Sequence, residues 1–185
     1  VGEGGVVRNL GIENGDITGK DYLGTVAGAV YNSTIENCFS TVRLSGGSFT
    51  GGIAGMVREG LVQNCHSAGD MNGGSNVGGI AGFVADGTMQ NCYSTGSVTG
   101  TGSNVGGVTG HVDSNGAVQN CAALNSDVNG VSGVGRITGQ LSANALLDGN
   151  IAFRGLRVLE NNALQNITDG AAGNRNGLDK SASDI

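Results

Sequence analysis

The chain has 185 residues, with 37 glycines, four cysteines, no proline and no tryptophan, and its net charge is −6. This length fits one domain, and an apolar share of 38% allows a buried core. The nine Lys and Arg residues are scattered along the chain, which argues against nucleic acid or an anionic membrane surface as a partner.

The beginning of the chain gives little guidance about targeting. It starts at Val1, without a start methionine or a basic and apolar leader, so we expect a mature or excised piece of a longer parent chain. No apolar run approaches the roughly 20 residues of a membrane-spanning helix, so we expect no membrane insertion. Residues 1–20 are interpreted as an N-terminal partial coil.

Residues 21–145 contain an internal repeat. A glycine motif recurs as GTVAG (24–28), GGIAG (51–55), GGIAG (78–82), GGVTG (106–110) and GRITG (135–139). Asn-Cys pairs recur at similar intervals of 27, 27 and 29 residues, at Asn37-Cys38, Asn64-Cys65, Asn91-Cys92 and Asn120-Cys121. A self-similarity of 27–29 residues is typical of stacked repeats.

The residues inside each repeat predict short β-strands. In "NCYSTGSVTG" the series Cys92, Ser94, Gly96 and Val98 would face one way and the intervening residues the other. Glycine pairs and Asp-Gly or Asn-Gly steps separate such runs as turns. The sequence therefore predicts an all-β chain that forms a right-handed parallel β-solenoid of about five to six coils, each of 27–29 residues.

The repeated Asn-Cys pair has a structural explanation in such a fold. Asparagine tolerates the left-handed backbone of a sharp corner, and stacked asparagine amides can bond from coil to coil. A corner at Asn91 would let Met89 and Cys92 both point inward, where a small thiol suits a narrow core. We therefore expect Asn37, Asn64, Asn91 and Asn120 at a corner and Cys38, Cys65, Cys92 and Cys121 in an interior column.

The stretch "VGGIAGFVADGTMQNCYSTGSVTG" resembles the GLUG motif, and the resemblance extends over roughly residues 20–140. This motif occurs in bacterial surface and secreted proteins, including adhesins and the non-catalytic regions of immunoglobulin A1-cleaving metallopeptidases. The resemblance implies an extracellular or cell-surface β-solenoid that is one module of a longer chain. It implies no ligand and no catalytic residue.

The cysteine spacing argues against a metal site. Zinc ligands usually come in pairs two to four residues apart, whereas these cysteines lie one coil apart. Neighbouring coils would bring their Cα atoms within disulfide range, but parallel side chains in one rotamer do not readily reach the required dihedral angle. We expect buried reduced thiols, with bridged neighbours as the alternative, and no metal or other cofactor.

One outward column contains rings. His66 follows Cys65 directly, so strand alternation places the two side chains on opposite faces and separates a possible Cys-His pair. Phe39 and Tyr93 occupy the equivalent outward positions in the neighbouring repeats. The structural interpretation of this column is a stripe of solvent-facing side chains on the surface. The functional interpretation is that the stripe contacts a protein or a glycan.

Two acids occupy the same turn of consecutive repeats. Glu59 and Asp86 stand 27 residues apart, and stacking could bring them near the roughly 5 Å separation of a retaining glycosidase. Asp-Gly and Glu-Gly dipeptides are also common in ordinary turns. In the next repeat, Asp113 is displaced by two residues, so the structural interpretation is favoured.

Residues 146–185 lose the cysteine and gain larger apolar residues. They are interpreted as a terminal coil, a cap or a linker, because an open solenoid end exposes unpaired strand edges. The predicted function is a non-catalytic stalk, spacer or adhesion module of a bacterial secreted or cell-surface protein. The alternatives are a glycan- or host-matrix-binding β-solenoid and a polysaccharide-active β-helix enzyme. A host surface protein or glycan is the candidate partner.

Overall fold

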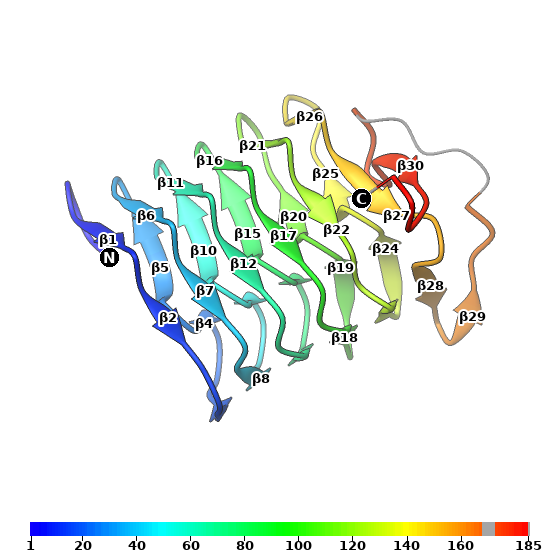
Figure 1. Cartoon of the computed structure of the whole chain (residues 1–185), viewed down its shortest axis with the longest axis horizontal. Helices are drawn as coiled ribbons and strands as arrows, with labels where there is room; N and C mark the ends of the chain where they lie inside the picture. The colour runs from blue at the N-terminus through cyan, green and yellow to red at the C-terminus, as the bar shows by residue number, and fades with distance from the viewer. Residues whose placement is uncertain (168–172, 185) are drawn as a thin grey trace.

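The computed structural model describes residues 1–167 and 173–184. These residues form strands, turns and loops, and none of them belongs to a helix long and apolar enough to cross a membrane. The strands stack into a parallel β-solenoid (Figure 1), which confirms the predicted fold class.

Each complete coil passes through five short strands, and equivalent strands of successive coils form five sheets. Sheet A contains β1 (Val6–Arg8), β6 (Thr34–Glu36), β11 (Leu61–Gln63), β16 (Thr88–Gln90), β21 (Ala117–Gln119) and β26 (Leu146–Asp148). Sheet B contains β2 (Gly11–Ile12), β7 (Phe39–Ser40), β12 (His66–Ser67), β17 (Tyr93–Ser94), β22 (Ala122–Ala123), β27 (Ile151–Phe153) and β30 (Leu178–Lys180).

The other three sheets complete the coil. Sheet C contains β3 (Asp16–Thr18), β8 (Arg43–Ser45), β13 (Met71–Gly73), β18 (Val98–Gly100), β23 (Asp127–Gly130), β28 (Arg157–Glu160) and β29 (Ala163–Leu164). Sheet D contains β4 (Leu23–Gly24), β9 (Thr50–Gly51), β14 (Val77–Gly78), β19 (Ser103–Gly106) and β24 (Ser132–Gly135). Sheet E contains β5 (Ala27–Tyr31), β10 (Ala54–Arg58), β15 (Ala81–Ala85), β20 (Thr109–Val112) and β25 (Thr138–Leu141).

The coil is right-handed. In Figure 1 the chain descends through sheet B on the near side and rises through sheet E on the far side as it advances from left to right. Five coils are complete, and a sixth contributes β26, β27 and β28 before the regular path ends. Residue 20 lies inside the first coil, between β3 and β4, and residue 145 lies just before the sixth.

The core is a set of columns that run along the solenoid. On sheet A the inward column begins at half-buried Val7 and continues through fully buried side chains, Ile35, Val62, Met89 and Val118. Alternation within a strand decides which side chains enter, because successive Cβ atoms point to opposite faces. Cys92, Ser94 and Val98 are buried, whereas Tyr93 and Thr95 between them are exposed.

Close stacking favours glycine at the second position of the GGIAG motif in the second to fourth coils, whereas the first coil has Thr25 there. A Cβ added to Gly79 would collide with the carbonyl oxygen of Gly107 and the hydroxyl of Ser94. Gly52 faces the carbonyl of Gly79 in the same way. The glycine motif therefore lets neighbouring coils approach to full backbone pairing, a role beyond the turns that the sequence indicated for the glycine pairs.

Three corners of the coil use left-handed backbone geometry. The column between sheets A and B contains Asn9, Asn37, Asn64, Asn91, Asn120 and Gly149, with φ between 52° and 64°. The column between sheets E and A contains Asn32, Glu59, Asp86 and Asn115, with φ between 44° and 57°. The column between sheets C and D contains Tyr22, Phe49, Asn76, Asn104 and Gly133, with φ between 56° and 64°.

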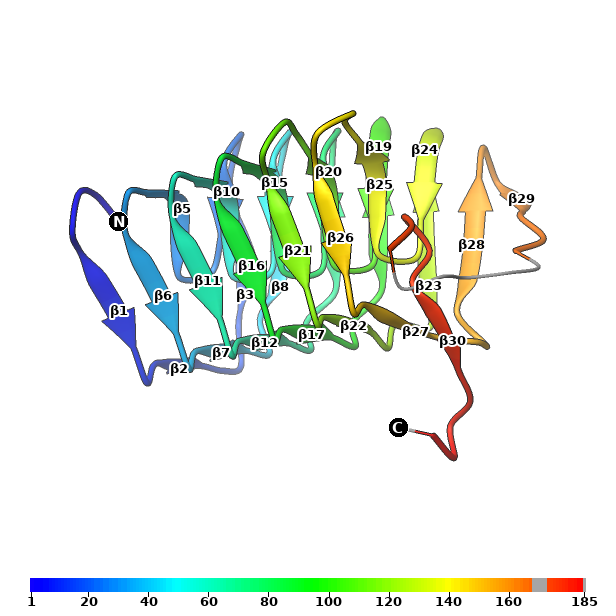
Figure 2. The ribbon, with the colours of Figure 1, turned by 90° about the horizontal axis from the view of Figure 1, so that it is seen from above.

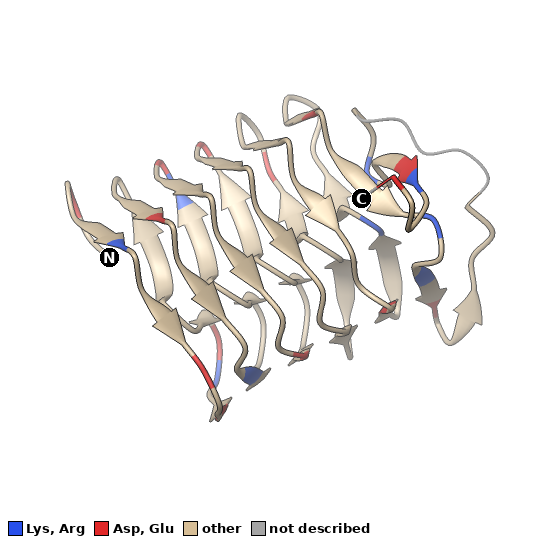
Figure 3. Cartoon of the chain, in the orientation of Figure 1, with Lys and Arg blue, Asp and Glu red and all other residues tan. Residues whose placement is uncertain are grey.

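Charged residues lie mostly at corners and at the ends, so the sheet faces carry few of them (Figure 3). Five of the nine basic residues fall in the last third of the chain, at Arg136, Arg154, Arg157, Arg175 and Lys180. Seen from above, β30 lies beside β27 and crosses the end of the stack (Figure 2). The C-terminal end of the solenoid is thus covered by β30.

Candidate functional site

The four cysteines form one interior column and are free thiols. Each is at most 2% exposed. Each thiol donates to the backbone carbonyl two residues earlier, at 3.1 to 3.2 Å, and the Cys38 amide donates to the Cys65 sulfur at 3.4 Å. The backbone and the neighbouring coil thus fix all four side chains in a repeated environment.

That environment keeps at least two of the thiols protonated. Burial raises the pKa of the Cys38 thiol above its ordinary value. Hydrogen bonding with the thiols of Cys121 and Cys65, together with burial, raises the pKa of Cys92 well above its ordinary value. Because the thiolate is the nucleophile and the metal-binding form, Cys38 and Cys92 suit packing better than chemistry, whereas hydrogen bonding with the Cys92 thiol lowers the pKa of Cys65.

The asparagines of the repeated pair occupy the corner between sheets A and B. Asn37, Asn64, Asn91 and Asn120 have φ of 54°, 54°, 55° and 52°. The Asn37 amide donates to the side-chain oxygen of Asn9 at 3.4 Å, one coil away. The corner turns the chain so that Met89 and Cys92, three residues apart, both enter the core.

The last coil changes the residues of this pair. Gln119 pairs with Asp148, so Gly149 occupies the corner and Asn150 falls in the cysteine column. Asn150 is fully buried, accepts from the Cys121 amide at 2.9 Å and donates to the Val118 carbonyl at 2.8 Å. A buried amide can take the thiol position because both its polar ends are bonded.

The ring column on sheet B is a continuous stack. Phe39 and His66 have ring centroids 5.1 Å apart with planes within 5°, and His66 and Tyr93 are 4.8 Å apart within 2°. The Phe39 ring lies over Gly11, and the next position after Tyr93 is Ala122. The ring faces therefore mainly contact one another, and mainly the ring edges remain accessible to a partner.

The acids at the corner between sheets E and A line a shallow groove of about 600 Å³. Glu59 and Asp86 lie at equivalent corner positions of adjacent coils, and Leu61, Thr88 and Gln90 form part of the floor. The Asn115 amide donates to Asp86 at 3.1 Å, and Arg58 lies 3.8 Å from Glu59. Both carboxylates thus have surface partners and open to solvent.

Asp113 lies two residues before the equivalent corner position, as the sequence indicated. A hydrogen bond from the Ser114 backbone, and a second from the Ser142 hydroxyl at 2.9 Å, lower the pKa of Asp113 below its ordinary value. This acid is therefore held ionised and cannot act as a proton donor near neutral pH. Within residues 1–167 and 173–184, no three His, Cys, Asp or Glu side chains gather in a way that could hold a metal ion.

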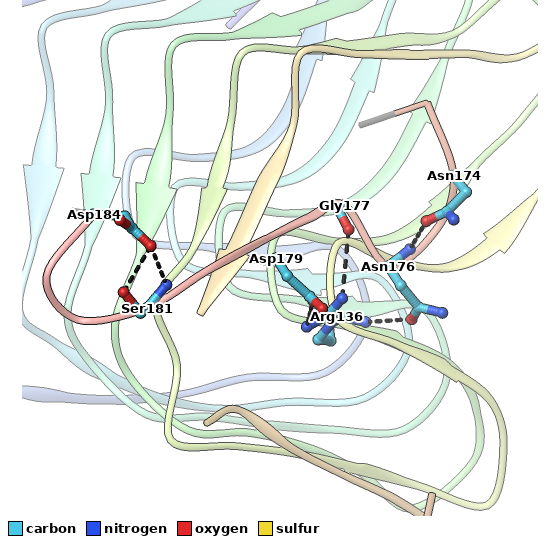
Figure 4. Close-up of polar contacts among 7 residues, drawn as sticks. All are labelled: Arg136, Asn174, Asn176, Gly177, Asp179, Ser181 and Asp184. Carbon is cyan, nitrogen blue, oxygen red and sulfur yellow. Dashed lines mark hydrogen bonds and ion pairs between the residues drawn. The ribbon is translucent and has the colours of Figure 1, made fainter. Parts of the chain in front are cut away.

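The structure also brings together residues that sequence reasoning did not single out. Arg136 and Asp179 form an ion pair with 2.5 Å between nitrogen and oxygen, and the Arg136 side chain is only 3% exposed (Figure 4). The sequence did mark Arg136 as unusual, because this residue replaces the second glycine of the repeated motif in GRITG. Asp179 gave no such signal, since residues 146–185 do not follow the repeat.

Comparison with known proteins identifies the repeat. A profile of the GLUG motif matches residues 73–99, which span one coil length. No curated protein matches the chain. The fold is similar to a crystal structure of a "putative immunoglobulin A1 protease" from Bacteroides ovatus, with a TM-score of 0.70 and 27% sequence identity.

That similarity covers 97% of this chain and 62% of the other one. The chain thus corresponds to part of that protein. The coils on either side of residues 73–99 keep the same strand register, from sheet A round to sheet E. The chain is therefore a β-solenoid with a GLUG motif at residues 73–99, and its other coils repeat the strand register of that segment.

Proposed function

We propose that this chain is a non-catalytic stalk, spacer or adhesion module of a secreted or cell-surface protein. The supporting observation is that the cysteines, the rings and the corner acids occupy repeated columns of the solenoid. Active sites tend to break local sequence rules at one place, whereas these side chains follow one rule in coil after coil. The likeness to part of a protease-like protein supports a location outside the cell.

The test uses the purified chain and human immunoglobulin A1. We expect no cleavage product after prolonged incubation, as judged by mass spectrometry of the antibody chains. A product that disappears in a Glu59→Gln or Asp86→Asn variant of unchanged circular dichroism would contradict the non-catalytic role. Thr95→Ala, on an exposed position away from the groove, is the matched control.

Glycan binding is the second candidate function, and the groove between sheets E and A favours it. The groove runs across several coils, and amide, hydroxyl and carboxylate groups line it. The Gln90 amide donates to Gln63 at 2.8 Å and the Gln63 amide donates to Glu36 at 3.0 Å, so the adjacent amides are already ordered. Ordered polar groups lose little entropy when they bind a ligand.

An array of glycans and extracellular-matrix proteins distinguishes the two roles. A pure spacer gives no saturable signal on any spot. A glycan-binding module gives a signal that falls at least tenfold in the Gln90→Ala variant and is unchanged in Thr95→Ala. Loss of binding in both variants would point away from the groove and toward another surface.

A further inference from the structure

The groove between sheets E and A is lined by three rows of side chains. The corner row contributes Glu59 and Asp86. Two residues further along the chain, the floor row on sheet A contributes Leu61 and Thr88. Two residues beyond Thr88, the amide row contributes Gln90. Each row has one member per coil, so the groove follows the long axis of the stack. These residues belong to inner coils that have a neighbouring coil on both sides.

The hydrogen bonds between coils fix the spacing of side chains along the groove. Leu61 pairs with Thr88, and Thr88 pairs with Ala117, in parallel register. Strands paired in this way lie about 4.8 Å apart, so equivalent side chains recur at about this interval. A pyranose residue in an extended, equatorially linked chain advances by nearly the same distance. A linear polysaccharide that lies along the groove thus places one sugar against each coil.

A peptide matches this groove less well than a sugar chain. Recognition through a peptide backbone needs a free strand edge, but the strands beneath the groove already pair with a neighbouring coil on both sides. An extended peptide also presents side chains to one face about every 6.6 Å, which is out of step with the coils. The groove therefore recognises its ligand through carboxylate, hydroxyl and amide side chains, which suit a ligand rich in hydroxyl groups.

The charge of the groove selects among sugars. Its charged side chains are Glu59 and Asp86, and the described residues that line it include no Lys, Arg or His. Arg58, beside the groove, lies 3.8 Å from Glu59 and offsets only that carboxylate. Carboxylates accept strong hydrogen bonds from hydroxyl groups, but they repel the carboxylates or sulfates of an acidic polysaccharide. The lining therefore favours a neutral sugar chain.

We propose that the groove between sheets E and A binds a neutral linear polysaccharide that lies parallel to the solenoid axis, with one sugar against each coil. The site is that of the second candidate function, glycan binding, on which the proposal rests. The Leu61 side chain packs against the C–H groups of one sugar, while Asp86 and Gln90 bond hydroxyl groups on either side of the next. Similar contacts recur in neighbouring coils, so a longer chain engages more of them and binds more tightly.

The test is isothermal titration calorimetry of the purified chain with β-1,4-linked oligosaccharides of glucose and of N-acetylglucosamine, from two to six sugars long. The affinity for at least one series should rise about tenfold or more from the disaccharide to the pentasaccharide. Galacturonate oligomers of the same lengths should not bind. An affinity already complete at the disaccharide, a preference for galacturonate, or binding of other array glycans but of neither series would overturn the proposal and leave glycan binding intact. An array without any glycan signal would remove both.

Two variants test the orientation of the sugar chain. Thr88→Phe places a ring across the middle of the groove and should reduce the affinity for the pentasaccharide to that for the disaccharide, which still fits on one side. Thr95→Phe, the matched control, adds the same ring at an exposed position of the same coil away from the groove and should keep the wild-type length dependence. Asp86→Asn keeps a residue that tolerates the φ of 51° and should weaken pentasaccharide binding without changing the circular dichroism. Folded Thr88→Phe and Asp86→Asn proteins that bind the pentasaccharide like wild type would overturn the proposal.

Discussion

The inner coils and the C-terminal end of the stack solve the same packing problem with different residues. In the middle of the stack each coil has a neighbour on both sides, so the motif needs glycine, the corner takes asparagine, and the inner column takes cysteine. At the end, Arg136, Gly149 and Asn150 occupy these three positions. The residue type that a position accepts therefore depends on the coil stacked on it and not on its own strand alone.

The largest expected effect comes from adding one methyl group in the middle of the stack. Gly79→Ala should lower the free energy of unfolding by about 3 kcal/mol or more, because the new Cβ meets the fixed backbone of the next coil. Urea unfolding followed by circular dichroism measures the loss. Gly2→Ala is the control, since a Cβ there has nothing within 4 Å, and it should be neutral. A tolerated Gly79→Ala would show that the coils can separate without loss.

The core columns should show the same contrast between middle and end. Met89→Ala removes a fully buried side chain between two coils and should cost about 3 kcal/mol through lost contacts and a cavity. Val7→Ala removes methyl groups from the half-buried start of the same column and should cost about 1 kcal/mol. Equal losses in urea unfolding would mean that the first coil is as well covered as the fourth.

Much of this architecture could be predicted from the sequence. The 27–29 residue period specified the stacking, and alternation around Cys92 specified which side chains enter the core. These features are local and repeated, so each copy supports the others. The corner at Asn91 was predictable for the same reason, since a residue type that tolerates positive φ recurs at one spacing.

The end of the stack could not be predicted in this way. Asp179 meets Arg136 across 43 positions of sequence, through a segment that does not follow the period. The column of Tyr22, Phe49 and Asn76 was also missed, because its residue type changes from ring to amide while only the backbone conformation stays constant. Sequence reasoning thus fails where a single long-range contact, or a conformation without a fixed residue type, determines the structure.

The corner between sheets A and B should tolerate glycine but not alanine. Asn91→Ala should cost about 1 kcal/mol, because alanine pays a steric penalty at the φ of 55° that Asn91 adopts. Asn91→Gly should be close to neutral, as the natural Gly149 at the last corner indicates. Thermal unfolding of the two variants side by side measures the difference. If both lost the same stability, the asparagine side chain and not the backbone conformation would be the important feature.

The smallest expected effect is the pH dependence of stability that His66 contributes within the stacked rings. Burial lowers the pKa of His66 below its ordinary value of 6.5, so the folded chain binds fewer protons here than the unfolded chain as the pH falls. The contribution to stability is therefore complete above about pH 6.5 and is lost as the pH falls toward the lower pKa of the folded state.

His66→Phe keeps a ring between Phe39 and Tyr93 and removes this titration. The variant should lose less stability than wild type between neutral pH and pH 5, as measured by urea unfolding at each pH. Burial also lowers the pKa of His111, on sheet E, so part of the wild-type dependence should remain in the variant. His111 is 3.2 Å from the Ser142 hydroxyl and packs edge-on against Phe83, away from the stack. If His66→Phe and wild type lost the same stability as the pH falls, protonation of His66 would not weaken the stack. The stability of the coils would then not depend on the charge of this ring.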